Sequence, residues 1–224
     1  MPETQQMQPL RVEIELGGPT VVPDRHPPLL DSLLLSLLGQ RLELPFPASS
    51  IPVQSARDAH WPEGEFVWMA SAVEIAFVGP ATDRILHRNA RPLELLKDAA
   101  SLHATSVDFD RGLTKVTRKR LSVRQATHAI AWCIGQQDAL VQLLGHLQAL
   151  GAHRHLGLGL VRGVRVVHDP KALEMSWSRP LPSEHSQDPY RGRRLRSAGR
   201  ATPPYWSRDL TRQAWWPAPT APII

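Results

Sequence analysis

Apolar and charged side chains alternate along residues 10–16, which read LRVEIEL. Alternation with a period of two predicts a strand that buries one face and exposes the other. Residues 65–79 and 121–135 alternate in part, and residues 160–168 are rich in valine. We therefore expect single strands at 121–135 and 160–168, and one long strand or two shorter ones at 65–79.

Leucine-rich segments between these strands predict helices. Residues 29–40 (LLDSLLLSLLGQ) place Asp31 in the first turn, where a carboxylate suits the helix dipole, and Gly39 near the end. Residues 137–150 carry apolar side chains at the spacing of an amphipathic helix, namely Leu140, Leu143, Leu144, Leu147 and Leu150. A third, shorter helix is predicted at 91–101.

The predicted elements follow the order strand, helix, strand or strands, basic insertion, strand, helix, strand. This order predicts an α+β fold of the ferredoxin-like (RRM-like) type, in which two β-α-β units share one sheet. We assign residues 1–169 to this domain and residues 80–120 within it to the basic insertion. Residues 170–224 are rich in proline, arginine, serine and tryptophan, so we expect them to form an extended C-terminal tail.

Composition adds a basic charge and an indication of compartment. The formal net charge is +5, and 22 of the 26 basic residues are arginine, whose planar fork suits bidentate contact with phosphate. Arginine-rich usage also follows from GC-rich coding, so the clustering of these residues is more informative than their number. With Cys133 as the only cysteine, no intrachain disulfide can form, and we see neither a signal peptide nor a membrane span. We therefore expect a cytoplasmic protein.

A glycine-rich stretch, GAHRHLGLGLVRG, occupies residues 151–163 between the second helix and the last strand. Gly157 and Gly159 allow a close approach of the backbone or a positive φ, and the phosphate-seeking residues Arg154, His155 and Arg162 flank them. One interpretation is an anion-binding concavity of backbone N–H groups, and the other is a helix end followed by a tight turn. A dinucleotide fingerprint fits poorly because these glycines precede a strand instead of following one.

The ordered set of segments resembles the RAMP superfamily of CRISPR proteins, whose common sequence mark is a loop such as HLGLGLVRG. The start, PLRVEIELGGPTVVPDRHPPLLDSLLLSLL, is similar to the Cas5-type subunit that caps the 5′ handle of the guide RNA in class 1 effector complexes, closest to its type IV version. The segment AIAWCIGQQDALVQLLGHLQALGAHRHLGLGLV fits the strand, helix and glycine-loop unit of the same family. The resemblance spans roughly residues 8–182.

This resemblance implies a non-catalytic subunit that binds crRNA at its 5′ handle, contacts the backbone and large subunits, and meets target DNA only through the complex. It also implies that the basic insertion is a thumb that contacts RNA. Five cations in the segment DFDRGLTKVTRKR are the candidates, namely Arg111, Lys115, Arg118, Lys119 and Arg120, and such a cluster favours RNA through counterion release. Arg25 and His26 precede the first helix, whose N-terminus favours a phosphate.

Each of these assignments has an ordinary structural alternative. Any single cation of the insertion is as readily part of a solvated loop, and His26 fits common turn chemistry. We expect the arginine-rich segment 190–200 to order on binding RNA or a partner. We expect the tryptophans of the tail (Trp206, Trp215 and Trp216) to dock on the core of the chain, with a neighbouring subunit as the alternative.

An enzyme is the second class of function that the sequence leaves open. No metal-ligand spacing, Walker motif or nucleophile elbow is present, so we expect no metal and no cofactor. A metal-independent endoribonuclease that processes the CRISPR repeat RNA needs only an acid, a base and cations. The candidates for it are His26, His155 and His128, with Tyr190 more distant, although His128 also fits a half-buried structural position. A generic RRM-like module is disfavoured because aromatic RNP motifs are absent.

Overall fold

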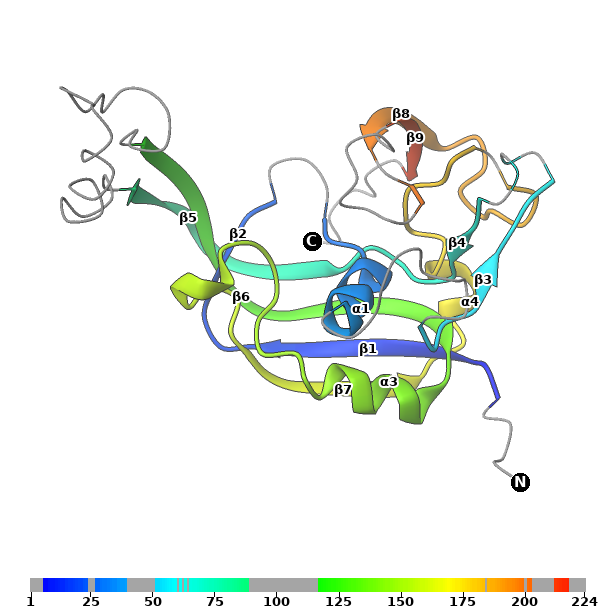
Figure 1. Ribbon diagram of the computed structural model, residues 1–224, viewed down its shortest axis with the longest axis horizontal. Helices are drawn as coiled ribbons and strands as arrows, with labels where there is room; N and C mark the ends of the chain where they lie inside the picture. The colour runs from blue at the N-terminus through cyan, green and yellow to red at the C-terminus, as the bar shows by residue number, and fades with distance from the viewer. Residues whose placement is uncertain are drawn as a thin grey trace, which may run out of the picture.

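A curled antiparallel sheet forms the centre of the chain in the computed structural model (Figure 1). The structure describes residues 6–23, 27–39, 51–59, 61, 63, 65–88, 117–183, 185–199, 201–202 and 212–217. The sheet contains β1 (Gln8–Leu16), β2 (Pro19–Val21), β5 (Glu74–Arg88), β6 (Thr117–Gly135) and β7 (Val161–His168). β6 pairs with β1 and β2 and also with β5, and β1 pairs in turn with β7. The chain is thus α+β, as predicted.

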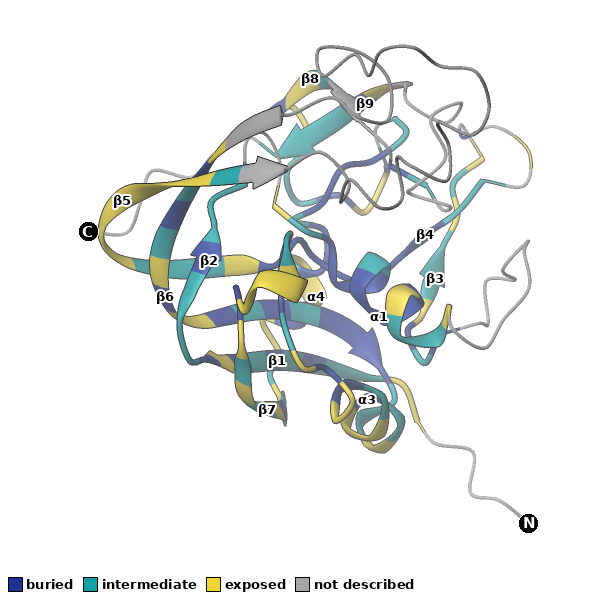
Figure 2. Ribbon diagram, turned by 60° about the vertical axis from the view of Figure 1, so that its left-hand side comes forward, coloured by how far each residue is buried: buried dark blue, intermediate teal, exposed yellow. Residues whose placement is uncertain are grey.

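The alternation in the sequence sets the two faces of this sheet. Leu10, Val12 and Ile14 of β1 are fully buried, and they lie opposite Cys133, Ala131 and Ala129 of β6. The intervening residues Arg11, Glu13 and Glu15 point to the other face, where more surface is accessible. Buried and exposed positions therefore alternate along the strands (Figure 2), as the period of two requires.

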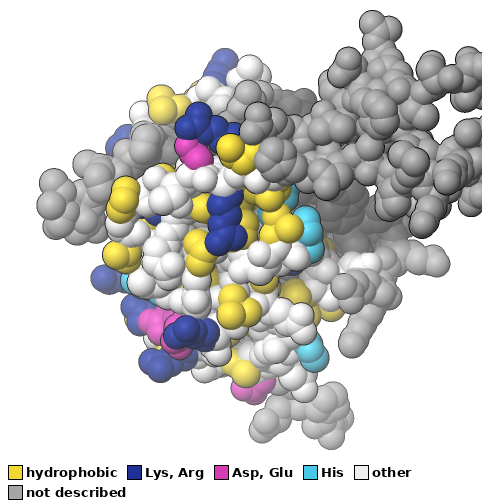
Figure 3. All heavy atoms as spheres, turned by 90° about the vertical axis from the view of Figure 1, so that its left-hand side faces the viewer, with side chains coloured by type: hydrophobic (Ala, Val, Ile, Leu, Met, Phe, Trp, Pro, Cys, Tyr) yellow, Lys and Arg dark blue, Asp and Glu magenta, His cyan; other side chains and the backbone are white. Residues whose placement is uncertain are grey.

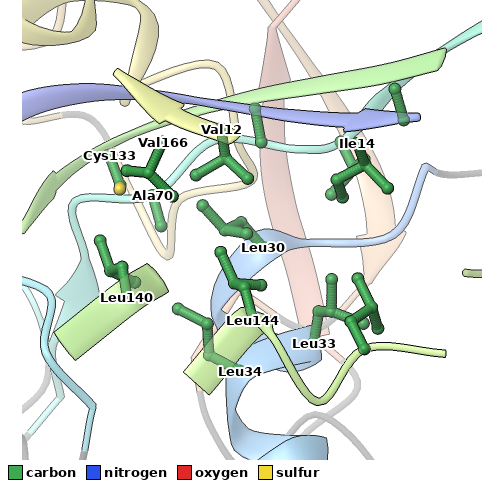
Figure 4. Close-up of a cluster of buried hydrophobic side chains, with 14 of the residues drawn as sticks. Val12, Ile14, Leu30, Leu33, Leu34, Ala70, Cys133, Leu140, Leu144 and Val166 are labelled. Carbon is green, nitrogen blue, oxygen red and sulfur yellow. The ribbon is translucent and has the colours of Figure 1, made fainter. Parts of the chain in front are cut away.

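Two helices cover the inner face with leucine side chains (Figure 4). They are α1 (Leu30–Leu38) and α3 (Gln137–Leu144). α3 ends six residues before the predicted end at Leu150, because the backbone N–H groups of Leu150 and Val161 instead join residues 148–150 to the glycine-rich loop. Leu147 and Leu150 still fill the core after the helix has ended. Among the described residues, no helix is long and apolar enough to cross a membrane.

β5 and β6 extend beyond the body as a long hairpin (Figure 1). The predicted strand at 65–79 is therefore two strands, with β4 (Val67–Trp68) before β5. Within the predicted basic insertion, residues 85–88 pair with residues 117–120, and residues 82–84 pair with residues 121–123 just beyond it. The register shifts between Val78 and Thr82. The helix predicted at 91–101 lies outside the described residues.

The C-terminal segment packs against the rest of the chain, which differs from the expected extended tail. It contains α4 (Ala172–Met175) and a hairpin of β8 (Arg194–Gly199) and β9 (Arg212–Pro217). Trp177 and Leu181 are buried in a cluster with Trp61 and Ile134, close to the short ladder of β3 (Ser55–Ala56) and β4. These apolar side chains, spaced among prolines and arginines, give the segment enough burial to fold.

The structure describes two of the three tryptophans of the tail. Trp215 and Trp216 lie half-buried in β9, and the backbone of Trp215 exchanges two hydrogen bonds with Leu181. This agrees with docking on the chain itself. Trp206 lies outside the described residues.

A fully buried ion pair joins the C-terminal segment to α1. Arg179 and Asp31 both have no exposed side-chain surface, and Arg179 Nη1 donates to Asp31 Oδ2 at 2.7 Å. The same guanidinium donates to the carbonyl oxygens of Trp68, Ala70 and Ala201. Asp31, predicted only as a dipole partner, thus also anchors α1, and its other oxygen accepts from the backbone N–H of Ser32.

A second buried arginine organises the segment internally. Arg194 donates to Asp188 through two nitrogens, at 2.5 and 2.8 Å, and also to the carbonyl oxygens of Trp177, Arg179 and Trp215. One arginine of the basic segment 190–200 therefore serves the fold.

Replacing Arg179 tests the first of these ion pairs. Arg179→Met leaves the Asp31 carboxylate buried without its cation, so we expect the free energy of unfolding to fall by about 3–5 kcal/mol. Arg165→Met is the matched control, because the Arg165 side chain is 77 % exposed and its loss should cost less than about 0.5 kcal/mol. Urea unfolding measures both, and equal effects in the two variants would contradict the anchoring role.

The buried thiol gives a prediction on pH. Burial raises the pKa of Cys133 to about 12, from 9.0 for a free thiol, so the native thiol stays protonated at pH 8. We expect an aromatic disulfide reagent to react with the denatured chain at once and with the native chain only at its rate of opening. Because the unfolded thiol ionises first, this group should also lower stability as the pH rises from about 9 to 12. Rapid labelling of the native chain would show that Cys133 is accessible.

Candidate nucleic-acid interface

The glycine-rich loop, residues 151–163, passes through a series of left-handed backbone positions. Gly151, Gly157 and Gly159 have φ values of 94°, 73° and 69°, and the non-glycine His153 has a φ of 58°. A single turn of 3₁₀ helix, Arg154–Leu156, lies between them. The predicted tight turn is therefore present, and glycine is the residue that adopts such positions without strain. The expected helix end at Gly151 is wrong, because α3 ends at Leu144 with Gly145 as its C-cap.

Gly159 also fastens the loop to the end of β2. An added Cβ at Gly159 would lie 1.8 Å from the carbonyl oxygen of Leu150, so no other residue fits. The Gly159 N–H donates to Pro19, and its carbonyl oxygen accepts from the Leu150 N–H, at 2.9 and 2.8 Å. The buried hydroxyl of Thr20 donates to the Leu150 carbonyl oxygen at 3.3 Å. These bonds fix the loop against the sheet.

Gly157 has more open surroundings. No atom lies within 4 Å of an added Cβ there, although its N–H donates to the Arg154 carbonyl oxygen at 3.0 Å. The N–H groups of both glycines thus already have acceptors within the protein. This geometry favours the turn interpretation, because the N–H groups of Gly157 and Gly159 are not free to bind an anion. A phosphate at the loop would therefore be bound by side chains of the loop. RNA contact by the two glycines stays a prediction.

An open cleft of about 430 Å³ lies between the loop, the first half of α1 and the base of the β5–β6 hairpin. Arg120 of β6 and His153 and Arg154 of the loop line it. Three serines add polar groups to the lining, namely Ser32, Ser36 and Ser122. Aliphatic side chains form its apolar part, including Val21, Leu29, Leu33, Ile75 and Leu150. Cationic, hydroxyl and aliphatic groups therefore face one space.

A small apolar cluster brings the loop and the hairpin together at this cleft. Leu158 is 1 % exposed and packs with Leu121 and Val123 of β6, with Val21 and Leu86 at the edge. Three consecutive residues of this part of β6, Arg120, Leu121 and Ser122, also line the cleft. The buried leucine between two glycines is thus what positions the loop beside the basic strand.

The arginines of the hairpin base have partners that limit their freedom. Arg120, 77 % exposed, forms an ion pair with Asp83 of β5, and the hydrogen bond from Arg120 to Asp83 raises the pKa of the guanidinium. Arg124 Nε donates to the Gly79 carbonyl oxygen at 2.5 Å, and its guanidinium lies 5.6 Å from the Phe77 ring centroid. On this side of the molecule, cationic side chains are interspersed among exposed hydrophobic ones (Figure 3).

The structure describes eight of the twelve predicted site residues, and these fall into three groups. Arg120 and Arg154 line the cleft, and His155, Gly157, Gly159 and Arg162 lie on or beside the loop. Arg118 and Lys119 belong to the paired part of β6. Arg25, His26, Arg111 and Lys115 lie outside the described residues.

Several of these residues have details that the sequence did not indicate. Arg162 does not line the cleft but crosses over Gly17, where an added Cβ would lie 2.5 Å from its Nε. His128, expected to be half-buried, is exposed on the outer face. Tyr190 is half-buried, and its pKa is raised by burial first and then by Glu174 and Glu74.

The sequence analysis missed His153, Ser32, Ser36, Ser122 and Arg124 as neighbours of the site. The alternation of Arg118, Arg120, Ser122 and Arg124 along β6 carries a signal for one polar face. The serines of α1 carry no such signal, because their position depends on how the helix packs. No group of three or more metal-ligating side chains occurs in the described part of the chain.

A family model described as CRISPR type IV associated protein Csf3 matches residues 8–217 of this chain. The match covers the whole sheet, both core helices and the C-terminal hairpin, and it defines the class as a RAMP protein of type IV CRISPR systems. The chain belongs to the Csf3 family of Cas5-like RAMP proteins. The predicted resemblance is thereby confirmed, and the family gives the chain a role in a class 1 CRISPR effector complex. No curated protein matches the chain.

Comparing two glycines tests the geometry of the loop. Gly159→Ala and Gly157→Ala both place a side chain at a positive φ, which costs about 1–2 kcal/mol. Gly159→Ala adds the clash with Leu150, and we expect about 1–3 kcal/mol of further destabilisation from it. Thermal unfolding followed by circular dichroism measures the difference, and equal melting temperatures for the two variants would contradict the close approach.

Proposed function

We propose that the protein is the non-catalytic crRNA-binding subunit that caps the 5′ handle of the guide RNA in a type IV effector complex. In this proposal it has the ferredoxin-like RAMP fold, the β5–β6 hairpin is its thumb, and it contacts both the backbone and the large subunit. Target DNA reaches it only through the assembled complex.

The strand order supports the ferredoxin-like fold. Along the sheet β7, β1, β6 and β5 are neighbours, each pair antiparallel. In chain order these strands and the helices α1 and α3 follow the pattern β-α-β-β-α-β, with α1 after β1 and α3 after β6. β2 follows β1 and pairs with the next part of β6. The carbonyl oxygen of Pro19 in β2 accepts the hydrogen bond that holds the glycine-rich loop.

The observation that carries the RNA-binding proposal is the meeting of Arg120 and Arg154 at one cleft. The two residues come from segments 34 positions apart, Arg120 from the hairpin and Arg154 from the loop, and both side chains are exposed. Arginines hold phosphates through charge-assisted hydrogen bonds, while the aliphatic lining suits the face of an unstacked base. A cleft with both features fits single-stranded RNA better than a duplex.

The hairpin supports contact with a neighbouring protein subunit. Val78 and Ile85 are each 53 % exposed on β5, and exposed aliphatic side chains of this kind gain free energy when a partner covers them. The cations Arg111 and Lys115 of the predicted thumb lie in the sequence between the two strands of this hairpin, so they belong to the same proposed RNA contact.

A histidine-based endoribonuclease is the second candidate, because His153 and His155 lie close together on the loop. Their ring centroids are 5.8 Å apart, a separation at which one can act as base and the other as acid on the same phosphate. Incubating the chain with repeat RNA and a chelator tests this. Cleavage that disappears in His155→Ala would favour the nuclease, and no cleavage favours the capping role.

Mapping of crosslinked nucleotides tests where the subunit lies on the guide. In the assembled complex, ultraviolet crosslinks from this chain should concentrate in the 5′ handle of the crRNA. Crosslinks confined to the base of a 3′ repeat hairpin would contradict the capping role and favour the processing nuclease.

Removing the two cleft arginines should weaken guide binding in a salt-dependent way. For Arg120→Gln with Arg154→Gln we expect about a tenfold or greater rise in Kd for handle-containing crRNA, because charge-assisted hydrogen bonds are lost. The slope of log K against log salt concentration should fall by about 0.7 for each phosphate contact removed. Arg165→Gln is the control, since Arg165 lies on the outer face of the sheet. Fluorescence anisotropy measures both, and unchanged slopes in the double variant would overturn this use of the cleft.

A further inference from the structure

The outer face of the sheet is covered at one end and open at the other. At the covered end, Ile134 packs with Ala172 of α4 and with Trp177 and Leu181 of the C-terminal segment. At the open end, a hollow of about 440 Å³ lies over β6, β1 and β7, lined by Glu13, Glu15, His128, Ile130, Gly163 and Arg165. No other described segment lines this hollow, so the sheet face is unpartnered there.

Strand register puts the side chains of this face in two rows. One row runs from Glu74 of β5 through Ile130 and Glu13 to Arg165. The next runs through His128 and Glu15 to Gly163, where the missing side chain deepens the hollow. An aliphatic side chain is thus bordered by carboxylates on neighbouring strands, at the spacing over which cross-strand groups interact.

The three carboxylates of these rows, Glu13, Glu15 and Glu74, differ in whether they form ion pairs with nearby cations. Glu13 forms an ion pair with Arg11 at 2.6 Å and a longer contact with Arg165 at 3.9 Å. Glu15 and Glu74 form no ion pair with any cation of the described residues. Burial raises the pKa of Glu74 although part of the side chain is exposed, and its charge acts in turn on Tyr190. A cation placed here would stabilise both unbalanced carboxylates.

These carboxylates are notable in a chain of net charge +5. Carboxylates repel the phosphates of RNA, so this face suits the guide less well than the cleft with Arg120 and Arg154 does, although Arg165 also lines the hollow. Complementary charge across an interface favours one partner and excludes others. The partner that fits carries basic side chains and enough aliphatic surface to cover Ile130.

We propose that the open half of the outer sheet face docks a lysine- or arginine-bearing segment of a neighbouring protein subunit of the effector complex. Glu15 and Ile130 line the hollow of this face, and Glu74 lies beside it, paired with Ile130. The segment lies across β1 and β6, its cations meet Glu15 and Glu74, and its aliphatic stems cover Ile130. RNA and a second copy of this chain are the alternative occupants, and the test below distinguishes them. The inference needs only membership in the complex and does not depend on where the guide is bound.

Charge reversal tests the docking face. The variants are Glu15→Lys and Glu74→Lys, with Glu15→Gln as a milder change. Glu63→Lys is the matched control, because Glu63 is exposed, lies in no strand of this sheet and does not line the hollow. Each chain is titrated into the crRNA-loaded complex of the other subunits. We expect the Kd for incorporation to rise about tenfold for either reversal, less for Glu15→Gln, and to stay within about twofold for Glu63→Lys. Added salt should weaken docking of the unaltered chain.

Parallel measurements separate this inference from the capping role and from misfolding. Melting temperatures show whether each variant is folded, and the Kd of the free chain for crRNA should not rise in the reversals. Incorporation of Glu15→Lys equal to that of Glu63→Lys would overturn the inference. A crRNA affinity weakened by the reversals would overturn it in favour of an RNA contact. Loss of a self-associated form in light scattering would overturn it in favour of a second copy.

Discussion

The structure depends on a guanidinium that has no access to solvent. Arg179 holds Asp31 in the first turn of α1 and binds carbonyl oxygens from the segment around β4 and from Ala201. Because a buried charge is stable only when its partners are complete, these segments must come together as a unit. α1 then presents its serines to the cleft from a fixed position, although the ion pair itself contains no group that would contact RNA.

A comparable constraint acts at the other wall of the cleft. Gly159 brings the loop against Leu150 and Pro19, and Leu158 packs on the base of the hairpin. The glycines thus determine where Arg154 lies, and their own amides stay bonded within the protein. The chain therefore has two separate hollows: Arg120 and Arg154 meet at the cleft, and Glu13, Glu15 and Arg165 line the outer face of the sheet. Each face therefore suits a partner of different chemistry.

Local patterns predicted the elements, but they did not predict contacts between distant segments. The period of two along residues 10–16 and 121–135 identified β1 and β6, and leucine spacing identified α1 and the start of α3. The fold of the C-terminal segment was missed because its burial rests on single residues, such as Trp177 and Arg194, spread among prolines and exposed arginines. The pairing of Arg179 with Asp31, 148 positions apart, has no local signal, and neither does the outward position of His128.

The most direct test of the account is the identity of the residues that crosslink to the guide. A crRNA with a photoreactive nucleotide in its 5′ handle is irradiated in the assembled complex, and the crosslinked peptides are identified by mass spectrometry. The account predicts crosslinks to the glycine-rich loop at residues 151–163 and to the base of β6 at residues 120–124. Crosslinks to β1 on the outer sheet face, with none to the loop, would contradict it.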